Sequence, residues 1–358
     1  MKAAIMHGFN RELTIEEIEL GGPRAGEVLV NLKASGVCHS DWHALKGDWG
    51  DYGLPLVLGH EGAGMVQEVG AGVTAVKPGD HVILAWRTNC GICEMCQHGW
   101  PNLCTAPPST GQRGTVGGEP LHRFTDTGTF ATHTVVPESA PVVMPKEIPF
   151  AQAALIGCGV MTGYGAAVNT ARVRAGSTVA VFGCGGVGLN CIQGARVAGA
   201  EMIIAVDLRD NKLELGRRFG ATHTVNAADN DPVEAILELT GGEGVHYAFE
   251  AIGVASAPYS QSVRCTRRRG TTVWVGHAPL NTAVQFDARD LFFERTVIGS
   301  FYGSARTHVD FLRILALYRE GKLMLDELVS RQLPLERVND AFASLAEGDV
   351  ARSVLIMD

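Results

Sequence analysis

The sequence predicts an α/β protein of two domains, in which a β-rich domain accompanies a doubly wound domain with a parallel sheet. Three observations predict this fold class. The length of 358 residues suits about two domains. Residues 1 to about 150 alternate short apolar runs with glycine and proline turns. The rest of the chain alternates apolar strands with helical patterns.

The β-rich part contains short apolar runs that are separated by Gly-Asp, Pro-Gly and Gly-Gly turn signals. We expect strands at 28–37, 64–70, 81–86, 130–136 and 142–145. Glycine accounts for 44 residues without a fixed period, so it must serve turns and close backbone approaches. These features predict a mostly β, barrel-like domain.

From about residue 151, apolar runs such as TVAVF and MIIAV lack a polar face, as parallel strands do when helices cover both sides of their sheet. We expect strands at 177–183, 202–207, 223–227, 246–253 and 271–276, and helices at 187–200, 211–221 and 231–241. A helix at 309–323 and a strand at 352–358 follow. The alternation predicts a doubly wound α/β domain.

Composition and charge exclude several classes of protein. A hydrophobic content of 46% with 19% charged residues excludes a disordered chain, and a net charge of -8 disfavours nucleic-acid binding. The basic run at 267–269 is typical of a solvated loop. No apolar run approaches the roughly 20 residues of a membrane helix, and the first residues lack a signal-peptide core. We therefore expect a cytoplasmic protein without membrane or nucleic-acid partners.

A glycine fingerprint follows the expected strand at 177–183, where Gly183, Gly185 and Gly188 form a G-x-G-x-x-G. Gly183 would make the tight turn, Gly185 would let a pyrophosphate approach the backbone, and Gly188 would allow close helix packing. The helix that opens with Gly186 and Val187 would direct N–H donors and partial positive charge at the phosphates. The pattern predicts a dinucleotide site.

Asp207 ends the next expected strand. Its carboxylate would accept hydrogen bonds from the adenosine ribose and would repel a 2′-phosphate, which favours NAD over NADP. Arg209 follows two residues later and leaves that choice open. A glycine-rich turn with an acidic ribose ligand also suits an S-adenosylmethionine site, but the remaining motifs favour the dinucleotide.

Nine cysteines, an odd number, predict metal ligation rather than disulfides in a reducing compartment. Four of them, Cys90, Cys93, Cys96 and Cys104, follow the pattern C-x2-C-x2-C-x7-C. Four thiolates can close a tetrahedron around Zn2+ and leave no open position, which predicts a structural zinc site. An iron–sulfur cluster is the alternative, although no proline follows the fourth cysteine as in the bacterial ferredoxin run.

A second group of potential ligands is scattered along the chain. It comprises Cys38, His60 with the adjacent Glu61, and Cys158. Taken singly, each cysteine is explained as a small buried apolar residue, and His60 is explained as a hydrogen-bonded histidine in the core. Sequence distance alone does not join them.

Four motifs follow one another along the chain: GVCHSDWH at 36–43, GHEGAG at 59–64, the cysteine loop and the glycine fingerprint. This order resembles the zinc-dependent medium-chain alcohol dehydrogenase family over essentially the whole chain. The resemblance implies a GroES-like catalytic domain at 1–155 and 297–358 and an NAD-binding Rossmann domain at 156–296, with the active site in the cleft between them. It also implies a homodimer or homotetramer.

The same resemblance implies a catalytic zinc that is held by Cys38, His60 and Cys158, with a fourth position for water or alcohol. Glu61 and Asp41 would be nearby carboxylates, and Asp41 would orient His60. The zinc would lower the pKa of the alcohol hydroxyl while a hydride leaves for the nicotinamide.

By analogy with the family, Ser40 would take the alcohol proton, and His43 at the surface would receive it. Outside the motif these residues would read as a turn serine and an exposed histidine.

The resemblance also suggests the coenzyme contacts. Thr162 would lie against the nicotinamide, His39 and Arg352 would face the pyrophosphate, and Lys212 would approach the adenosine ribose. His39 stands where similar enzymes have a basic residue, and its charge is less certain than that of arginine.

Trp49 and Trp86 would line the substrate channel and favour primary or planar aromatic alcohols, although both also suit core or surface aromatics. The chain also resembles the class that oxidises the glutathione adduct of formaldehyde, but Trp49 replaces that class's acidic residue two positions after Gly47. Two further alternatives are a zinc-free reductase of the superfamily and a non-enzymatic zinc or redox sensor.

Overall fold

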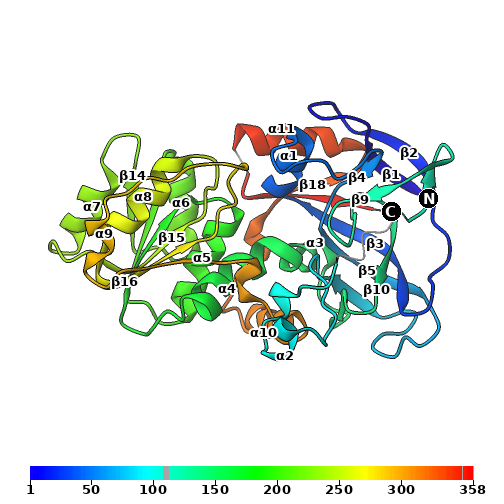
Figure 1. Ribbon diagram of the computed structural model, residues 1–358, viewed down its shortest axis with the longest axis horizontal. Coiled ribbons are helices and arrows are strands. Elements are labelled where there is room, and N and C mark those ends of the chain that lie inside the picture. The colour runs from blue at the N-terminus through cyan, green and yellow to red at the C-terminus, as the bar shows by residue number, and fades with distance from the viewer. Residues whose placement is uncertain (108–112, 349, 358) are drawn as a thin grey trace. The chain divides into compact units, whose positions relative to one another are not determined.

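The computed structural model describes residues 1–107, 113–348 and 350–357. The chain forms two compact units (Figure 1). Unit 1 comprises Met1–Cys158, Arg306–Glu320 and Leu325–Asp358, and unit 2 comprises Gly159–Ala305 and Gly321–Met324. The C-terminal segment therefore belongs to the unit that the N-terminal strands build.

Unit 1 contains two sheets. The six-stranded sheet has the order β8 (Glu119–Pro120), β7 (Thr115–Val116), β2 (Thr14–Glu19), β1 (Lys2–Met6), β4 (Leu56–Val57), β9 (His122–Arg123). The second sheet has the order β11 (Pro141–Val143), β6 (His81–Leu84), β5 (Glu61–Val69), β3 (Glu27–Val37), β19 (Arg352–Ile356), β18 (Val329–Pro334), and β10 (His133–Pro137) also pairs with β3. This confirms the β-rich domain that the sequence predicts.

β3 is the central strand of unit 1 and confirms the strand expected at 28–37. Its 11 residues pair with β5, β10 and β19, all antiparallel. The expected strands at 64–70, 81–86 and 142–145 correspond to β5, β6 and β11. The strand expected at 130–136 begins only at His133, because the backbone of Phe130 and Ala131 pairs with β1 and Leu58 instead of continuing β10.

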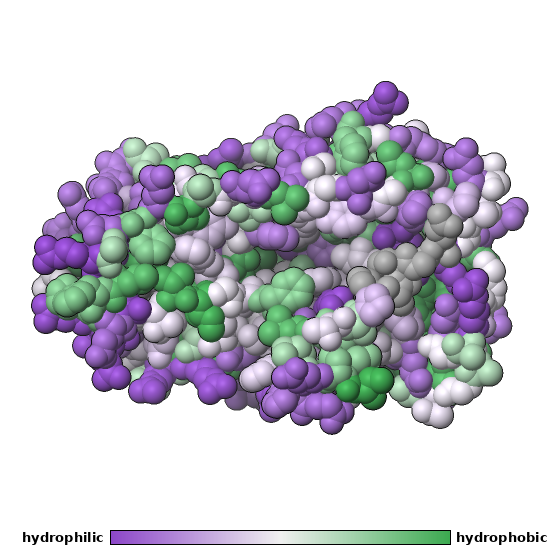
Figure 2. Space-filling model, viewed as in Figure 1, coloured by the Kyte–Doolittle hydropathy of each residue, from purple (hydrophilic) through white to green (hydrophobic). Residues whose placement is uncertain are grey.

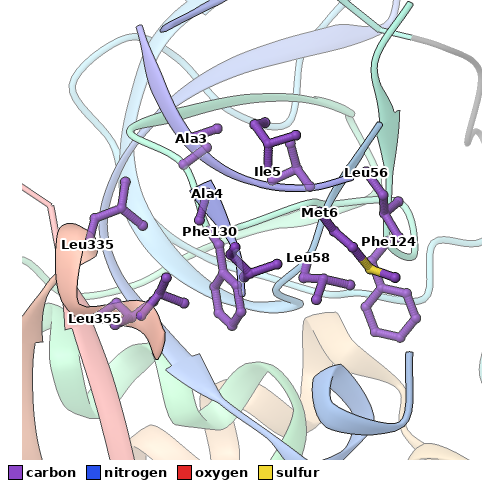
Figure 3. Close-up of a cluster of buried hydrophobic side chains, with 14 of the residues drawn as sticks. Ala3, Ala4, Ile5, Met6, Leu56, Leu58, Phe124, Phe130, Leu335 and Leu355 are labelled. Carbon is purple, nitrogen blue, oxygen red and sulfur yellow. The ribbon is translucent and has the colours of Figure 1, made fainter. Parts of the chain in front are cut away.

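The main core of unit 1 joins both ends of the described chain (Figure 3). Ile5 and Met6 of β1 and the ring of Phe130 are at most 1% exposed. They belong to one cluster with Leu335 and with Leu355 of β19. Each buried side chain of this size contributes about 1.5–3 kcal/mol, so the cluster holds the C-terminal segment against the N-terminal strands.

The helices of unit 1 are short and mostly lie between its strands. They are α1 (His39–Lys46), α2 (Glu94–Gln97), η1 (Pro101–Leu103), α3 (Phe150–Leu155), α10 (Thr307–Arg319), η5 (Asp326–Leu328), η6 (Leu335–Arg337) and α11 (Val338–Glu347). α10 confirms the helix expected from 309, but it ends at Arg319. Gly321 follows with a φ of 67°, a left-handed conformation that does not continue a helix.

One helical stretch, Phe150–Thr170, is long and apolar enough to cross a membrane. It joins α3, η2 (Ile156–Val160), α4 (Met161–Gly165) and η3 (Ala166–Thr170), of which η2 and η3 are π-helical. Its most apolar window is 83% buried inside the protein. The stretch is therefore a core helix of a soluble protein.

Unit 2 is built on a six-stranded parallel sheet. Its order is β14 (His223–Asn226), β13 (Met202–Asp207), β12 (Thr178–Phe182), β15 (Val245–Glu250), β16 (Thr266–Trp274), β17 (Thr296–Gly299). The accompanying helices are α5 (Gly186–Val197), α6 (Asp210–Phe219), α7 (Pro232–Leu239), α8 (Ser256–Arg264), α9 (Arg289–Phe292) and η4 (Tyr302–Ser304). The strand order reverses between β12 and β15, which confirms the doubly wound fold class.

Hydrophilic residues gather along the rim of the visible face, and apolar residues form a band across unit 2 (Figure 2). The exposed large apolar side chains of unit 2 include Leu291, Phe292, Phe293 and Ile298.

Candidate functional site

Cys38 lies between the end of β3 and the start of α1. It is the N-cap residue of α1 and has an extended backbone. One turn later, Oδ2 of Asp41 accepts a hydrogen bond from the Cys38 N–H at 3.1 Å. Asp41 is fully buried and Cys38 is 7% exposed. The carboxylate thus closes the first turn of α1 and fixes the position of the thiol.

His60 is held by the same carboxylate. Oδ1 of Asp41 accepts hydrogen bonds from Nδ1 of His60 and from the Gly59 N–H, each at 3.0 Å. An ionised carboxylate only accepts, so Nδ1 carries its hydrogen and Nε2 is the nitrogen left for a metal. Gly59 has a φ of 88°, and a Cβ there would lie 2.5 Å from the Phe130 ring. This position therefore requires glycine.

Cys158 lies in the π-helical turn η2. Such turns are frequent at functional sites, because the extra residue reorients the side chains of a helix. The preceding Gly157 has no room for a side chain, since a Cβ there would lie 2.9 Å from the carbonyl oxygen of Leu84. The close approach of the turn to β6 thus helps to position the Cys158 thiol.

These elements bring four potential ligands together. The ligand atoms of Cys38, His60, Glu61 and Cys158 lie within 4.8 Å of one another, and all four residues are buried. Nε2 of His60 is buried and has no hydrogen-bond partner among the described residues. An unpaired buried polar atom costs about 1–3 kcal/mol, and thiolates with an imidazole suit Zn2+. The residues therefore fit a zinc ion.

The two thiols of this cluster differ in acidity. A hydrogen bond with Cys158 outweighs burial and holds the pKa of Cys38 well below its ordinary value. The same hydrogen bond and burial raise the pKa of Cys158 well above its ordinary value. The pair therefore favours one thiolate beside one thiol, and a bound metal would displace the remaining proton.

Glu61 pairs with Arg352 beside the thiols. Nη2 of Arg352 donates a hydrogen bond to Oε2 of Glu61, and both residues are buried. Burial raises the pKa of Glu61 to about 7, although the Arg352 charge opposes the rise. The structure thus places Arg352 against Glu61, and its contact with a pyrophosphate stays a prediction.

The four cysteines of the loop also converge. The sulfur atoms of Cys90, Cys93, Cys96 and Cys104 lie within 4.8 Å of one another, and none of the nine cysteines forms a disulfide. The backbone N–H of Cys93 donates to the sulfur of Cys90 at 3.3 Å, and that of Cys90 donates to the sulfur of Cys104 at 3.4 Å. The backbone N–H groups of Cys96 and Thr105 lower the pKa of Cys93 to about 5. Such N–H donors stabilise thiolates, as a metal site requires.

The glycine fingerprint forms the turn between β12 and α5. Gly183 has a φ of 95° and Gly185 is the N-cap residue of α5, which opens with Gly186 and Val187. A Cβ on Gly188 would lie 1.7 Å from the carbonyl oxygen of Gly183, so any side chain there would collide with the turn. The strand, turn and helix therefore have the form that a dinucleotide pyrophosphate requires.

Asp207 at the end of β13 reaches the same turn. Its Oδ2 accepts a hydrogen bond from the Cys184 N–H at 2.8 Å, and its Oδ1 accepts one from the Arg209 N–H at 3.2 Å. The carboxylate thus lies at the edge of the glycine turn, where a ribose would meet it.

Two family models match the chain. They are the alcohol dehydrogenase GroES-like domain over residues 24–147 and the zinc-binding dehydrogenase over residues 186–317. The alcohol dehydrogenase class-3 of Cereibacter sphaeroides is 40% identical and covers 99% of both chains. The S-(hydroxymethyl)glutathione dehydrogenase of Paracoccus denitrificans is 38% identical with the same coverage. The chain belongs to the zinc-binding medium-chain alcohol dehydrogenase family.

Solved structures agree with this membership. An alcohol dehydrogenase zinc-binding domain protein from Burkholderia ambifaria has a TM-score of 0.95 and 36% identity, and covers 100% of this chain and 98% of that chain. The benzyl alcohol dehydrogenase from Acinetobacter calcoaceticus has a TM-score of 0.94 and 32% identity, with 100% and 99% coverage. The protein is thus a zinc-dependent alcohol dehydrogenase, and neither a zinc-free reductase nor a non-enzymatic sensor fits it.

The structure corrects one expectation about this alcohol dehydrogenase. The family resemblance predicts His43 at the surface, but the residue is only 6% exposed. The ring stacks on Trp49 with centroids 5.0 Å apart and an angle of 24°, and its Nδ1 lies 2.7 Å from Oδ2 of Asp48. The burial arises because the chain turns back over α1 after Gly47. Ser40 lies three residues earlier on α1, on the same side of the helix, and is half-buried.

Aromatic rings surround His60. Trp86 and Phe124 approach it edge-on, with centroids 6.3 Å and 5.6 Å away. Tyr52 packs edge-on against Phe124 at 5.1 Å. Trp86 could be singled out from the sequence, whereas Phe124 and Tyr52 could not, because no motif marks them. The pairing of β4 with β9, which lie far apart in the sequence, brings their segments together.

The remaining predicted coenzyme residues lie on three helices. His39 is exposed at the start of α1, Thr162 is half-buried on α4, and Lys212 is 8% exposed on α6. Their coenzyme contacts stay predictions.

Glu250, a further residue that the sequence patterns do not single out, ends β15 beside the glycine turn. It is fully buried, and its Oε1 accepts hydrogen bonds from the N–H groups of Ile252 and Gly253. An acidic residue that ends an apolar strand, as Asp207 does, was the available signal.

Proposed function

We propose that this alcohol dehydrogenase transfers a hydride between primary alcohols, aromatic ones included, and NAD. The edge-on packing of Trp86 and Phe124 against His60 carries the proposal for the substrate. Flat rings beside a metal ligand would form the walls of a slot for a planar substituent on a primary carbon, whereas a branched secondary carbon would collide with them. The similarity to a benzyl alcohol dehydrogenase supports the same class.

Zinc that is held by Cys38, His60 and Cys158 would supply a Lewis acid that acidifies the alcohol hydroxyl. Asp41 orients His60 by accepting from Nδ1, so that Nε2 faces the thiols. Glu61 and Arg352 add a buried carboxyl group and the cation that pairs with it. The chain's own residues thus build a preorganised and dry metal site.

Ser40 and His43 are proposed to carry the proton of the alcohol. Ser40 can both donate and accept a hydrogen, and His43 lies three residues later on the same side of α1. NAD would supply the hydride acceptor. The imidazole then holds the released proton until water removes it.

NAD is proposed over NADP because of the carboxylate of Asp207. Two backbone N–H groups hold this carboxylate at the edge of the glycine turn. A 2′-phosphate there would meet negative charge, and the Arg209 side chain would have to offset it. Thr162, His39, Lys212 and Arg352 are the further proposed contacts.

A second candidate is the oxidation of a thiol adduct of formaldehyde. The two relatives at 40% and 38% identity, named alcohol dehydrogenase class-3 and S-(hydroxymethyl)glutathione dehydrogenase, favour it. Against it, Trp49 stands where that class carries an acidic residue, and its ring stacks on His43 instead of offering a charge. A plain alcohol therefore fits this chain better.

The test is a panel of primary, secondary, benzylic and S-(hydroxymethyl)glutathione substrates with NAD and with NADP, followed by coenzyme absorbance. We expect the largest kcat/KM for benzylic and other primary alcohols with NAD. A preference for the glutathione adduct would favour the second candidate, and equal rates for secondary alcohols would overturn the proposed slot.

The remaining proposals concern the second metal and the assembly. The four-cysteine loop would hold a structural zinc in the cytoplasm, where thiols stay reduced. β17 forms an edge of the sheet of unit 2, and Phe292 and Ile298 near this edge are 78% and 41% exposed. An exposed apolar edge supports self-association into a homodimer or homotetramer, which light scattering would test.

A further inference from the structure

The end of α1 brings an acidic side chain back over His43. Gly47 is the C-cap residue of α1, with a φ of 79°. The Gly47 N–H donates to the carbonyl of Ala44, and the Asp48 N–H donates to the carbonyl of His43 at 3.0 Å. This is the hydrogen-bond pattern of a Schellman turn, which reverses the chain against the last helical turn. The sequence His-Ala-Leu-Lys-Gly-Asp thus determines that Asp48 returns to His43.

The two side chains then meet. Oδ2 of Asp48 lies 2.7 Å from Nδ1 of His43. The side chain of His43 is 7% exposed, whereas that of Asp48 is 30% exposed. The carboxylate therefore stays in contact with water while its partner is buried. Its charge keeps part of its hydration, so the contact costs little desolvation energy.

This contact decides which nitrogen of His43 is the base. An ionised carboxylate can only accept, so the hydrogen of the neutral ring is on Nδ1 and the lone pair is on Nε2. The ring also stacks on Trp49, which restricts its rotation. Removal of the Asp48 carboxylate would take away this acceptor for the Nδ1 hydrogen, and the ring could then adopt either tautomer.

We propose that Asp48 is a positioning residue for proton transfer, which fixes the tautomer of His43 and stabilises its imidazolium. The inference rests on the proposed function, because it assigns His43 the base role of that relay. Nε2 accepts one proton and the ring becomes a cation, while Asp48 stays ionised and offsets the charge. The cation then returns the proton to water and restores the starting tautomer. The arrangement resembles a base held by a buried carboxylate in hydrolytic triads.

The principal test compares Asp48→Asn with Asp51→Asn. Asp51 lies in the same loop and accepts a hydrogen bond from the Gly53 N–H at 2.8 Å, so it is the matched control. An asparagine keeps the size of Asp48 but carries no charge and allows either tautomer of His43. We expect Asp48→Asn to lower kcat for alcohol oxidation by about tenfold or more, with KM changed less than about twofold. Asp51→Asn should match the wild type.

A second arm uses Asp48→Ala with added formate. Because the Asp48 position is partly exposed, formate can enter and replace the missing carboxylate. Formate should raise the rate of Asp48→Ala severalfold without affecting the wild type. A role of Asp48 in folding alone would not produce this rescue.

A third readout needs no turnover. The proton on Nδ1 of His43 should give a downfield NMR signal in the wild type that is absent from His43→Gln and from Asp48→Ala. A kcat of Asp48→Asn within twofold of the wild type, or no rescue of folded Asp48→Ala, would overturn the inference. If the wild type itself reduces no NAD with any alcohol, the proposed function fails instead.

Discussion

Asp41 shows how much a single buried side chain can organise. It accepts hydrogen bonds from the backbone of Cys38, the backbone of Gly59 and the ring of His60. Two of these residues are proposed zinc ligands from segments 22 positions apart in the chain, and one carboxylate sets the position of both. The family resemblance implies that Asp41 orients His60, and the structure adds the hydrogen bond that Asp41 accepts from the N-cap residue of α1.

Trp86 should control the size of accepted alcohols. In Trp86→Ala, the loss of the indole beside His60 removes one wall of the proposed slot. We expect kcat/KM for secondary relative to primary alcohols to rise about tenfold, within the range that a change of pocket shape gives. The control is Trp100→Ala, since Trp100 is 52% exposed in the cysteine loop and should leave the profile unchanged. An unchanged profile for Trp86→Ala would contradict the assignment.

Glu250 should make stability depend on pH. Burial raises its pKa above the ordinary 4.5, so the folded protein binds this proton more tightly than the unfolded chain. The stability that the proton provides at low pH is lost as the pH rises through the folded pKa. Glu250→Gln has no such charge and keeps an acceptor for Ile252 and Gly253.

We therefore expect the Tm of Glu250→Gln relative to the wild type to increase between about pH 4.5 and neutrality. Thermal unfolding at several pH values measures it. Glu243→Gln, at an exposed turn, is the control and should show a constant difference. A difference for Glu250→Gln that stays flat or declines with pH would refute the explanation.

At the scale of elements, periodicity predicted the strands and helices that bury a continuous face. β3, β12, β13 and α5 lie close to their expected positions, because their apolar spacing reflects burial. The elements that position the site are different. α1 has only eight residues and η2 is a π-helical turn, so neither leaves a clear periodicity in the sequence.

The ligand set itself could be anticipated only through the family resemblance. Cys38, His60 and Cys158 become neighbours because β3, β5 and η2 meet, a long-range pairing that local sequence does not encode. The return of Asp48 to His43 is local and could be read from Gly47 in retrospect. The burial of His43 could not, because it also needs the Trp49 ring to fold back.

The folded structure of the cysteine loop should depend on its bound metal. Cys96→Ser removes one of four thiols that lie within 4.8 Å of one another. We expect one equivalent of zinc fewer per chain by metal analysis, together with faster proteolytic cleavage in the loop, because α2 and η1 are too short to be stable alone. Cys265→Ser is the control, since Cys265 is buried outside both clusters. Full zinc content in Cys96→Ser would contradict a four-thiolate site. Detection of iron with acid-labile sulfide in the wild type would indicate an iron–sulfur cluster instead of zinc.

At the scale of the whole molecule, the chemistry is divided between the units. Both ligand clusters lie within unit 1, and the glycine turn with Asp207 lies within unit 2. Each unit has a core of its own. A zinc chelator should therefore act mainly on unit 1, and a dinucleotide should act mainly on unit 2, with His39 and Arg352 as its proposed contacts from unit 1.

Differential scanning calorimetry tests this division. Chelation should lower the transition of unit 1, because both of its ligand clusters then lose the metal that joins their thiols, and that binding free energy is part of the folding free energy. NAD at 100 times its Kd should add about 2.7 kcal/mol to unit 2 and raise its Tm by about 8 °C. NADP at the same concentration should raise the Tm of unit 2 less than NAD does. In the Asp207→Ser variant, the difference between the NAD and NADP shifts should be smaller, because the carboxylate that opposes the 2′-phosphate is gone. A single transition that responds to both additions would mean that the units unfold together, and an equal response to NADP in the wild type would contradict the role of Asp207.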